Sequence, residues 1–198
     1  MKEAEKRRVA LVWIFLAIVI FLSFYFDSEI VKTVSLIRND TLTDFLMGIT
    51  FVSSILILFL FLTLLFVKEN KRKWVLPLWL SLVLSIAVSF LLKVSVQRPR
   101  PYIGGLVPVV DGLAKASHIV WDFSFPSFQV MLVFAAVPFL AKEFPRFKYI
   151  WIIFACLVAF SRVYLGLHFL SDVLIGGIIG YLIGFFALRW WTEKFRLY

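Results

Sequence analysis

The chain has 198 residues, of which 62% are hydrophobic, 18% aromatic and only 17% charged, with a formal net charge of +9. Soluble domains usually have about 25% charged and about 45–50% apolar residues. The composition therefore excludes a soluble globular domain, a disordered chain and a nucleic-acid-binding module with a water-facing basic surface. The single cysteine, Cys156, excludes a disulfide scaffold. We expect a polytopic membrane protein.

Six apolar segments have the length, or nearly the length, of about 20 helical residues that a bilayer crossing requires. In chain order they are 9–26, 45–67, 74–92, 126–141, 149–166 and 173–191. The fourth is short and the fifth contains Ser161 and Arg162, but polar groups inside a membrane helix are usually functional. The sequence therefore predicts an all-α bundle of six transmembrane helices that forms one membrane-embedded domain, 1–198.

Basic residues are distributed unevenly among the segments that connect these spans. The N-terminal tail, the C-terminal end and the connections after the second and fourth spans hold 14 of the 21 Lys and Arg residues. The connection 27–44 holds only Lys32 and Arg38. Because positive charge marks the cytoplasmic side of a membrane protein, both termini are predicted to be cytoplasmic.

Glycine recurs every fourth residue in the last span, at Gly176, Gly180 and Gly184. Such a stripe could line a ligand groove. Small residues at this spacing are more typical of close packing between membrane helices, because they let two backbones approach each other. We therefore predict that this face of the last span packs tightly against another helix.

Polar clusters lie at three predicted span ends that share the extracytoplasmic boundary. Lys93 and Arg100 follow the third span, Ser127 opens the fourth, and Arg162 lies near the end of the fifth. Lysine and arginine side chains bind phosphate oxygens and neutralise charge in phosphoryl transfer. A single cation at a helix end usually only reaches toward the lipid headgroups. Three clusters at one membrane level instead favour one phosphate-binding site.

His168 and Asp172 are four residues apart, so on a helical turn they share a face. A carboxylate that holds one imidazole nitrogen fixes the tautomer and leaves the other nitrogen as a nucleophile or base. Alone, His168 would more often be an interfacial histidine. The Cys, His and carboxylate residues show no metal-ligand spacing, so we expect neither a metal nor another cofactor.

Together these residues resemble the three-part signature of the type 2 phosphatidic acid phosphatase family, the lipid phosphate phosphatases. Lys93, Arg100 and Pro101 match its first motif, and its third motif is matched by Ser161, Arg162, His168 and Asp172. The resemblance covers about residues 41–191. It implies metal-independent removal of phosphate from a membrane lipid, with His168 forming a phosphohistidine that Asp172 orients. It also implies a set of residues that hold the phosphoryl oxygens: Lys93, Arg100, Ser127, Phe128 and Arg162.

The second motif departs from the family pattern. The family has Pro-Ser-Gly-His, whose histidine protonates the leaving oxygen, whereas this chain has Pro126-Ser127-Phe128-Gln129. Phe128 retains its backbone N–H but adds bulk. Gln129 occupies the position of the catalytic acid but cannot release a proton near neutral pH. General acid catalysis typically contributes about 10²–10⁴ in rate.

Three interpretations of this departure remain open. We prefer a lipid diphosphate such as a polyprenyl diphosphate as substrate, because its leaving group needs no proton. Alternatively, His118, eleven residues before Gln129, replaces the acid. The third possibility is a catalytically impaired relative that binds phosphorylated lipid headgroups. We expect a phosphatase in the cell membrane with its site on the extracytoplasmic side, acting on a lipid and on no nucleic acid.

Overall fold

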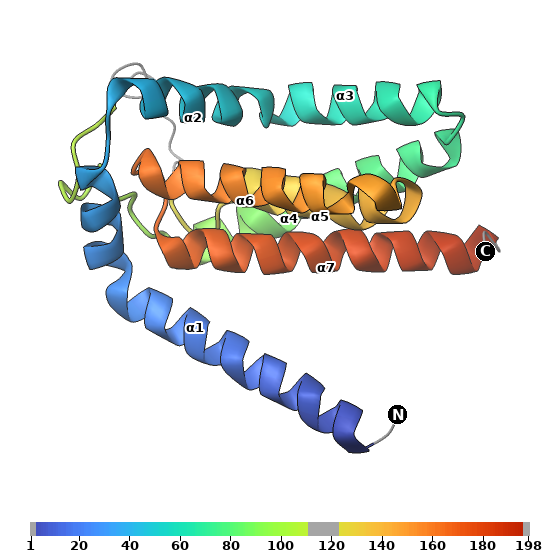
Figure 1. The fold of residues 1–198 in the computed structure, drawn as a ribbon, viewed down its shortest axis with the longest axis horizontal. Helices are drawn as coiled ribbons and strands as arrows, with labels where there is room; N and C mark the ends of the chain where they lie inside the picture. Colours follow the sequence, from blue (N-terminus) through green and yellow to red (C-terminus); the bar gives the residue numbers. More distant parts are fainter. Residues whose placement is uncertain (1–2, 111–122, 196–198) are drawn as a thin grey trace.

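The computed structural model describes residues 3–110 and 123–195 of the chain. These residues form helices and connecting turns, with no β-strand among them (Figure 1). The long helices are α1 (Glu3–Leu36), α2 (Asp40–Val52), α3 (Ile55–Lys68), α4 (Val75–Val96), α5 (Phe128–Glu143), α6 (Lys148–Tyr164) and α7 (Leu170–Phe195), and the short 3₁₀ turns are η1 (Arg72–Trp74) and η3 (Pro145–Phe147). The predicted all-α class is confirmed.

Several of these helices are long and apolar enough to cross a membrane. Among the described residues there are four such segments: Ala10–Leu36, Arg72–Val96, Pro145–Tyr164 and Leu170–Phe195. The bent pair α2 and α3 adds a fifth if it forms one span. The predicted fourth span corresponds to α5, whose 16 residues are fewer than a straight crossing needs. The described part of the chain is thus an integral membrane protein with four to five candidate spans, and six spans stay a prediction.

α1 is longer than the predicted first span, 9–26, and continues to Leu36. Much of the connection predicted over 27–44 is therefore helical. The reason is a buried face with helical spacing that continues past the apolar run, formed by Ser23, Asp27 and Val31. This face packs α1 against α7 and α6, whereas the N-terminal half of α1 leans away from the bundle (Figure 1).

The predicted second span, 45–67, is not one continuous helix. The chain breaks between α2 and α3 at Ser53 and bends by 61°. The Ser53 hydroxyl donates hydrogen bonds to the carbonyls of Ile49 and Thr50, at 2.8 and 3.1 Å. Serine hydroxyls that bond to the preceding turn compete with the backbone ladder and often bend a helix. Because Ser53 and Ser54 barely lower the mean hydropathy of the segment 45–67, a search for apolar runs does not detect the break.

The glycine stripe of α7 packs directly against α5, as predicted. A Cβ atom at Gly180 would lie 2.0 Å from the carbonyl oxygen of Met131, and one at Gly184 would lie 2.0 Å from that of Ala135. At Gly176 the nearest atom would be the carbonyl oxygen of Ser127, at 2.7 Å. Only glycine allows the two backbones to come this close, so the stripe fixes the start of α5 against α7.

Replacing Gly180 by alanine is expected to destabilise the protein by about 1–3 kcal/mol or more, because the backbone of α5 must shift to admit the methyl group. Gly48→Ala in α2 is the matched control, since a Cβ atom there meets nothing within 4 Å. That change should be neutral or stabilising by about 0.5–1 kcal/mol. Thermal unfolding in detergent measures both, and equal melting temperatures would contradict the packing.

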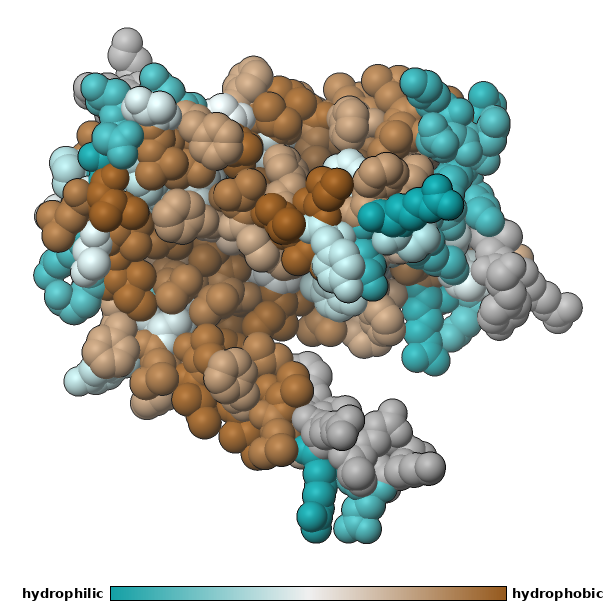
Figure 2. All heavy atoms as spheres, in the orientation of Figure 1, coloured by the Kyte–Doolittle hydropathy of each residue, from teal (hydrophilic) through white to brown (hydrophobic). Residues whose placement is uncertain are grey.

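The two ends of the bundle differ in the segments that they carry. The α3–α4 turn, the α5–α6 turn and the C-terminal end of α7 lie at one end, to the right in Figure 1, and the N-terminal end of α1 points the same way. Hydrophilic side chains gather there, whereas hydrophobic ones cover the middle of the face seen in Figure 2. At this end Lys71 joins the α3–α4 turn to Glu143 of α5 at 2.8 Å. The assignment of this end to the cytoplasm stays a prediction.

Candidate active site

Helix α4 ends at the residue before Gln97. Gln97 adopts a left-handed conformation with φ of 50°, and its N–H bonds to the carbonyl of Lys93 at 2.9 Å, which ends the helix. The Lys93 ammonium donates a hydrogen bond to the carbonyl of Phe123, near the far end of the α4–α5 connection. The N–H of Ser124 bonds to the carbonyl of Arg98 at 2.7 Å. Both ends of this connection are therefore held together beside α7.

His168 lies in the short turn between α6 and α7. Gly166 has φ of 72°, which favours glycine, and a Cβ atom there would lie 2.8 Å from a guanidinium nitrogen of Arg38. Arg38 Nε donates to the carbonyl of Tyr164 at 2.8 Å, so the α1–α2 turn braces this segment. The N–H of His168 bonds to the carbonyl of Arg162 at 3.2 Å. The turn is compact, and His168 is only 2% exposed.

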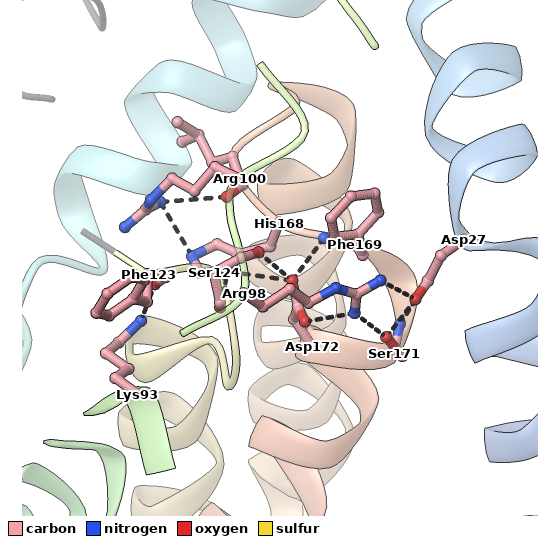
Figure 3. Close-up of polar contacts among 11 residues, drawn as sticks. Asp27, Lys93, Arg98, Arg100, Phe123, Ser124, His168, Phe169, Ser171 and Asp172 are labelled. Carbon is pink, nitrogen blue, oxygen red and sulfur yellow. Dashed lines mark hydrogen bonds and ion pairs between the residues drawn. The ribbon is translucent and has the colours of Figure 1, made fainter. Parts of the chain in front are cut away.

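The hydrogen bonds of His168 define its tautomer. Nε2 lies 3.3 Å from Arg100 Nη1, and Nδ1 lies 2.7 Å from the carbonyl oxygen of Ser124 (Figure 3). A guanidinium only donates, so Nε2 accepts and Nδ1 carries the proton. Burial, followed by the positive charge of Arg100, lowers the pKa of His168 to about 3. The imidazole is therefore neutral at neutral pH, with its lone pair at Nε2.

Asp172 lies below His168 with both carboxylate oxygens occupied. Oδ2 accepts hydrogen bonds from the Ser124 hydroxyl and from the N–H of Phe169, the latter at 2.8 Å. Oδ1 accepts from Arg98 at 2.9 Å. The distance from Oδ2 to His168 Nδ1 is 3.7 Å, so the direct partner of the imidazole is the Ser124 carbonyl. Ser124 thus lies between the two predicted partners and contacts both.

The start of α5 faces the same place. The N–H of Ser127 bonds to the backbone carbonyl of Asp172 at 3.0 Å, and the close approach at Gly176 makes room for this contact. The hydroxyl of Ser127 is buried, and it has no hydrogen-bond partner among the described residues. Phe128 follows as the first residue of α5, where backbone N–H groups have no helical acceptor. Its ring packs against the hydrophobic core.

The predicted cationic residues come from two separate stretches of the chain: Lys93 and Arg100 from the end of α4 and the residues after it, and Arg162 from α6. Arg162 is buried at the end of α6, near enough to His168 for its charge to help lower the pKa of that imidazole. Arg100 contacts His168 directly, and Lys93 contacts Phe123, the neighbour of Ser124. Residues far apart in the sequence therefore gather at one end of the bundle.

Gln129 makes its contacts with the α2–α3 break. Its amide nitrogen donates to the carbonyl of Thr50 and to the hydroxyl of Ser53, both at 2.6 Å. The Thr50 carbonyl is one of those that the break deprives of a helical N–H partner, so Gln129 stabilises the bend. The other predicted acid, His118, lies outside the described residues.

Four residues that shape this site are not among the predicted site residues: Asp27, Arg98, Ser124 and Ser171. A signal existed for Asp27, because a carboxylate on the buried face of a membrane helix requires a partner. Arg98 lies two residues before Arg100, but spacing alone cannot tell which arginine contacts which group. Within the described ranges, no three His, Cys, Asp or Glu side chains are placed to hold a metal ion.

Comparison with known proteins agrees with this architecture. Phosphatidylglycerophosphatase B of Bacillus subtilis is 31% identical over 187 residues, which cover 86% of this chain and 85% of that protein. Undecaprenyl-diphosphatase of Sulfolobus acidocaldarius is 25% identical over 189 residues, 89% of either chain. The crystal structure of a transmembrane PAP2-type phosphatidylglycerolphosphate phosphatase from Bacillus subtilis has a TM-score of 0.70 and 28% identity, covering 94% of this chain and 95% of its own.

The helical membrane fold and these similarities define a membrane phosphatase. Residues 74–196, more than half of the chain, match the model of the PAP2 superfamily. The chain belongs to the PAP2 superfamily, which confirms the resemblance found in the sequence motifs.

Proposed function

We propose that this protein is a lipid phosphatase that removes the terminal phosphate of a lipid diphosphate by covalent catalysis at His168. The observation that carries the proposal is the tautomer of this residue. Its Nδ1–H is engaged by the Ser124 carbonyl, and its Nε2 presents a lone pair 3.3 Å from Arg100. A neutral imidazole beside a fixed cation is suited to attack a phosphoryl group whose oxygens the cation holds.

The proposed reaction has two steps. In the first, Nε2 of His168 forms a bond to the terminal phosphorus while the bond from phosphorus to the bridging oxygen breaks, and the lipid monophosphate leaves with that electron pair. In the second, water attacks the phosphohistidine, the N–P bond breaks, and inorganic phosphate is released with neutral His168 restored. The Ser124 carbonyl and the Asp172 carboxylate, 2.7 and 3.7 Å from Nδ1, stabilise the positive charge on the imidazole in the intermediate.

The phosphoryl oxygens would be held by groups around His168. Two features support this assignment: the cations converge on one end of the bundle, and the Ser127 hydroxyl is buried with no acceptor among the described residues. Backbone N–H groups at the start of α5 add further donors. The proposed phosphate-binding residues are Lys93, Arg100, Ser127, Phe128 and Arg162.

The chemistry at Gln129 favours a diphosphate over a monoester. Its amide is bonded to Thr50 and Ser53 and carries no proton that it can release. An alkoxide leaves a phosphate monoester with difficulty unless an acid protonates it, whereas a lipid phosphate leaving a diphosphate is a stable anion. The similarity to a protein named undecaprenyl-diphosphatase supports a polyprenyl diphosphate as the substrate.

The proposed location is the cell membrane, with the site on the extracytoplasmic side. The site lies at the end of the bundle opposite the α3–α4 and α5–α6 turns (Figure 1). Those turns carry the clusters of Lys and Arg residues that mark the cytoplasmic side. A substrate in the outer leaflet would reach His168 without its headgroup crossing the bilayer.

Phosphate release from matched lipids tests the proposed function. We expect a polyprenyl diphosphate to be hydrolysed by the purified protein with kcat/KM about 10²-fold or more above that for phosphatidic acid or phosphatidylglycerol phosphate. Equal values for monoesters and diphosphates would refute the substrate preference. His118→Ala tests whether His118 replaces the missing acid. Under our proposal this variant retains activity, whereas loss of turnover would assign the role of the acid to His118.

Trapping of labelled phosphate separates an enzyme from a headgroup-binding protein. A rapid-quench reaction with a terminally labelled diphosphate should leave label on His168. Lipid binding without labelled protein and without phosphate release would instead support the catalytically impaired alternative.

The pH dependence tests the neutral imidazole. Because the pKa of His168 is lowered to about 3, its protonation should not limit kcat/KM until the pH falls far below neutral. Arg100→Gln removes one cause of the lowering, so the pKa of His168 should rise and the acid limb should move to higher pH. The wild type and Arg100→Gln are assayed with the same lipid, so ionisation of the substrate affects their two pH–rate profiles equally. Superimposable normalised profiles would contradict the proposed interaction.

A further inference from the structure

A buried charge cluster joins α1 to the site. Arg98 donates from Nη2 to the Asp27 carboxylate at 2.8 Å, and from Nη1 to Asp172 Oδ1 at 2.9 Å and to the Ser171 hydroxyl at 2.7 Å. Ser171 in turn bonds to Asp27 through its N–H, at 3.0 Å, and through its hydroxyl. Figure 3 shows Arg98 between the two carboxylates, with Asp27 projecting from α1.

The charges of this cluster are buried, which costs free energy unless each charge is paired. Asp27 is 2% exposed and Asp172 is fully buried, and a buried carboxylate is costly unless it is paired and hydrogen-bonded. The guanidinium of Arg98 is the cation that both carboxylates contact. The ring of Phe169, 3.9 Å from the centre of the guanidinium, and that of Phe24, 5.7 Å away, further restrict its position. Arg98 is thus fixed by α1, by α7 and by the turn that carries His168.

We propose that Arg98 and Asp27 are positioning residues that hold Asp172 in place beside His168, so that α1 contributes to the geometry of the site through Asp27. This inference rests on the proposed function. Arg98 fixes one oxygen of Asp172 and thereby aims the other at the Ser124 hydroxyl, which donates to it. The carbonyl of the same residue accepts the hydrogen bond from Nδ1–H of His168. Asp27 fixes the second arm of Arg98. Although Arg98 and Arg100 are only two residues apart, it is Arg100 that contacts Nε2, where the phosphoryl group would bind.

Steady-state kinetics of the full chain in detergent tests this division of roles. Asp27→Asn should lower kcat about tenfold and Arg98→Gln about a hundredfold, with KM and inhibition by inorganic phosphate each within about twofold of the wild type. Arg100→Gln should instead weaken phosphate inhibition about tenfold or more. Glu29→Gln is the control for Asp27→Asn, since Glu29 lies two residues along α1, is exposed and pairs only with Lys32 among the described residues.

The double variant distinguishes a chain of contacts from two separate effects. If Asp27 acts through Arg98, then Asp27→Asn in the Arg98→Gln background should cause little further loss. Ser171→Ala, which removes one hydroxyl with little change in volume, should lower kcat in the same way and keeps the test available if an arginine variant does not fold. Arg98→Lys should recover part of the activity because it retains the charge.

Several outcomes would overturn the positioning role. The first is an Asp27→Asn enzyme whose kcat equals that of Glu29→Gln. The second is a double variant in which Asp27→Asn lowers kcat as much as it does in the wild type. The third is an Arg98→Gln enzyme that loses inhibition by phosphate as Arg100→Gln does. In each case the wild type still hydrolyses lipid diphosphate, so the proposed function stands. A wild type without phosphatase activity would overturn the proposed function itself.

Discussion

Replacing His168 by alanine is expected to lower the rate of phosphate release by about 10⁴-fold or more, because the variant has no nucleophile and no covalent intermediate can form. Fluorescence-detected gel filtration and thermal unfolding would establish that the variant folds. Labelled phosphate should be trapped on the wild type and not on the variant.

A matched control is Ser81→Ala in α4. The Ser81 hydroxyl is buried and bonds within its own helix, to the carbonyl of Leu78 at 2.6 Å, so its removal deletes a buried polar group away from the site. This variant should keep near wild-type activity. If His168→Ala retains about a tenth of the activity or more, or if another residue is labelled, covalent catalysis at His168 is wrong.

Gln129→His is expected to raise kcat/KM for a lipid monoester by about 10²-fold, while the value for a diphosphate changes by less than about tenfold. A histidine restores a group that can protonate an alkoxide, and only the monoester requires that proton. The change also has a structural cost. A neutral imidazole has one N–H, so it can keep only one of the two hydrogen bonds to Thr50 and Ser53, which we expect to cost about 1 kcal/mol.

Gln129→Leu separates these two effects. It removes both hydrogen bonds without supplying an acid, so it should lower the melting temperature without any gain on monoesters. Phosphate release from both lipid classes and unfolding in the same detergent provide the comparison. A folded Gln129→His protein with unchanged monoester activity would show that the departure at this position does not determine the substrate.

The helix content and the α5–α7 packing could be predicted because they depend on local signals. Apolar runs of sufficient length predict membrane helices, and the repeat from Gly176 to Gly184 predicts a close backbone contact whatever its partner. By contrast, the break at Ser53 changes the hydropathy of its segment very little. Its stability depends on Gln129, a residue 76 positions further along the chain. A pattern read over one segment cannot include such a contact.

The candidate site could likewise be predicted from the sequence only in part. The motif residues His168, Asp172 and Arg100 were identifiable because their types and spacing carry recognisable chemistry, and the structure places them together. The Ser124 carbonyl was not identifiable, since any residue has a backbone carbonyl and only the folded chain shows which one faces Nδ1. Asp27 and Arg98 are separated by 71 positions, and two charges of opposite sign do not reveal their pairing in a sequence with many others.

The bracing of the site from the N-terminal third of the chain has a practical consequence for defining a minimal enzyme. The family match begins at residue 74, yet Asp27, Arg38 and Thr50 contact Arg98, Tyr164 and Gln129. A truncation at the family boundary would retain every signature motif but remove these contacts, so that Arg98 would keep Asp172 and lose the carboxylate that fixes its second arm. Fragment designs and chimeras should therefore retain α1, α2 and the turn between them, which carry these three contacts.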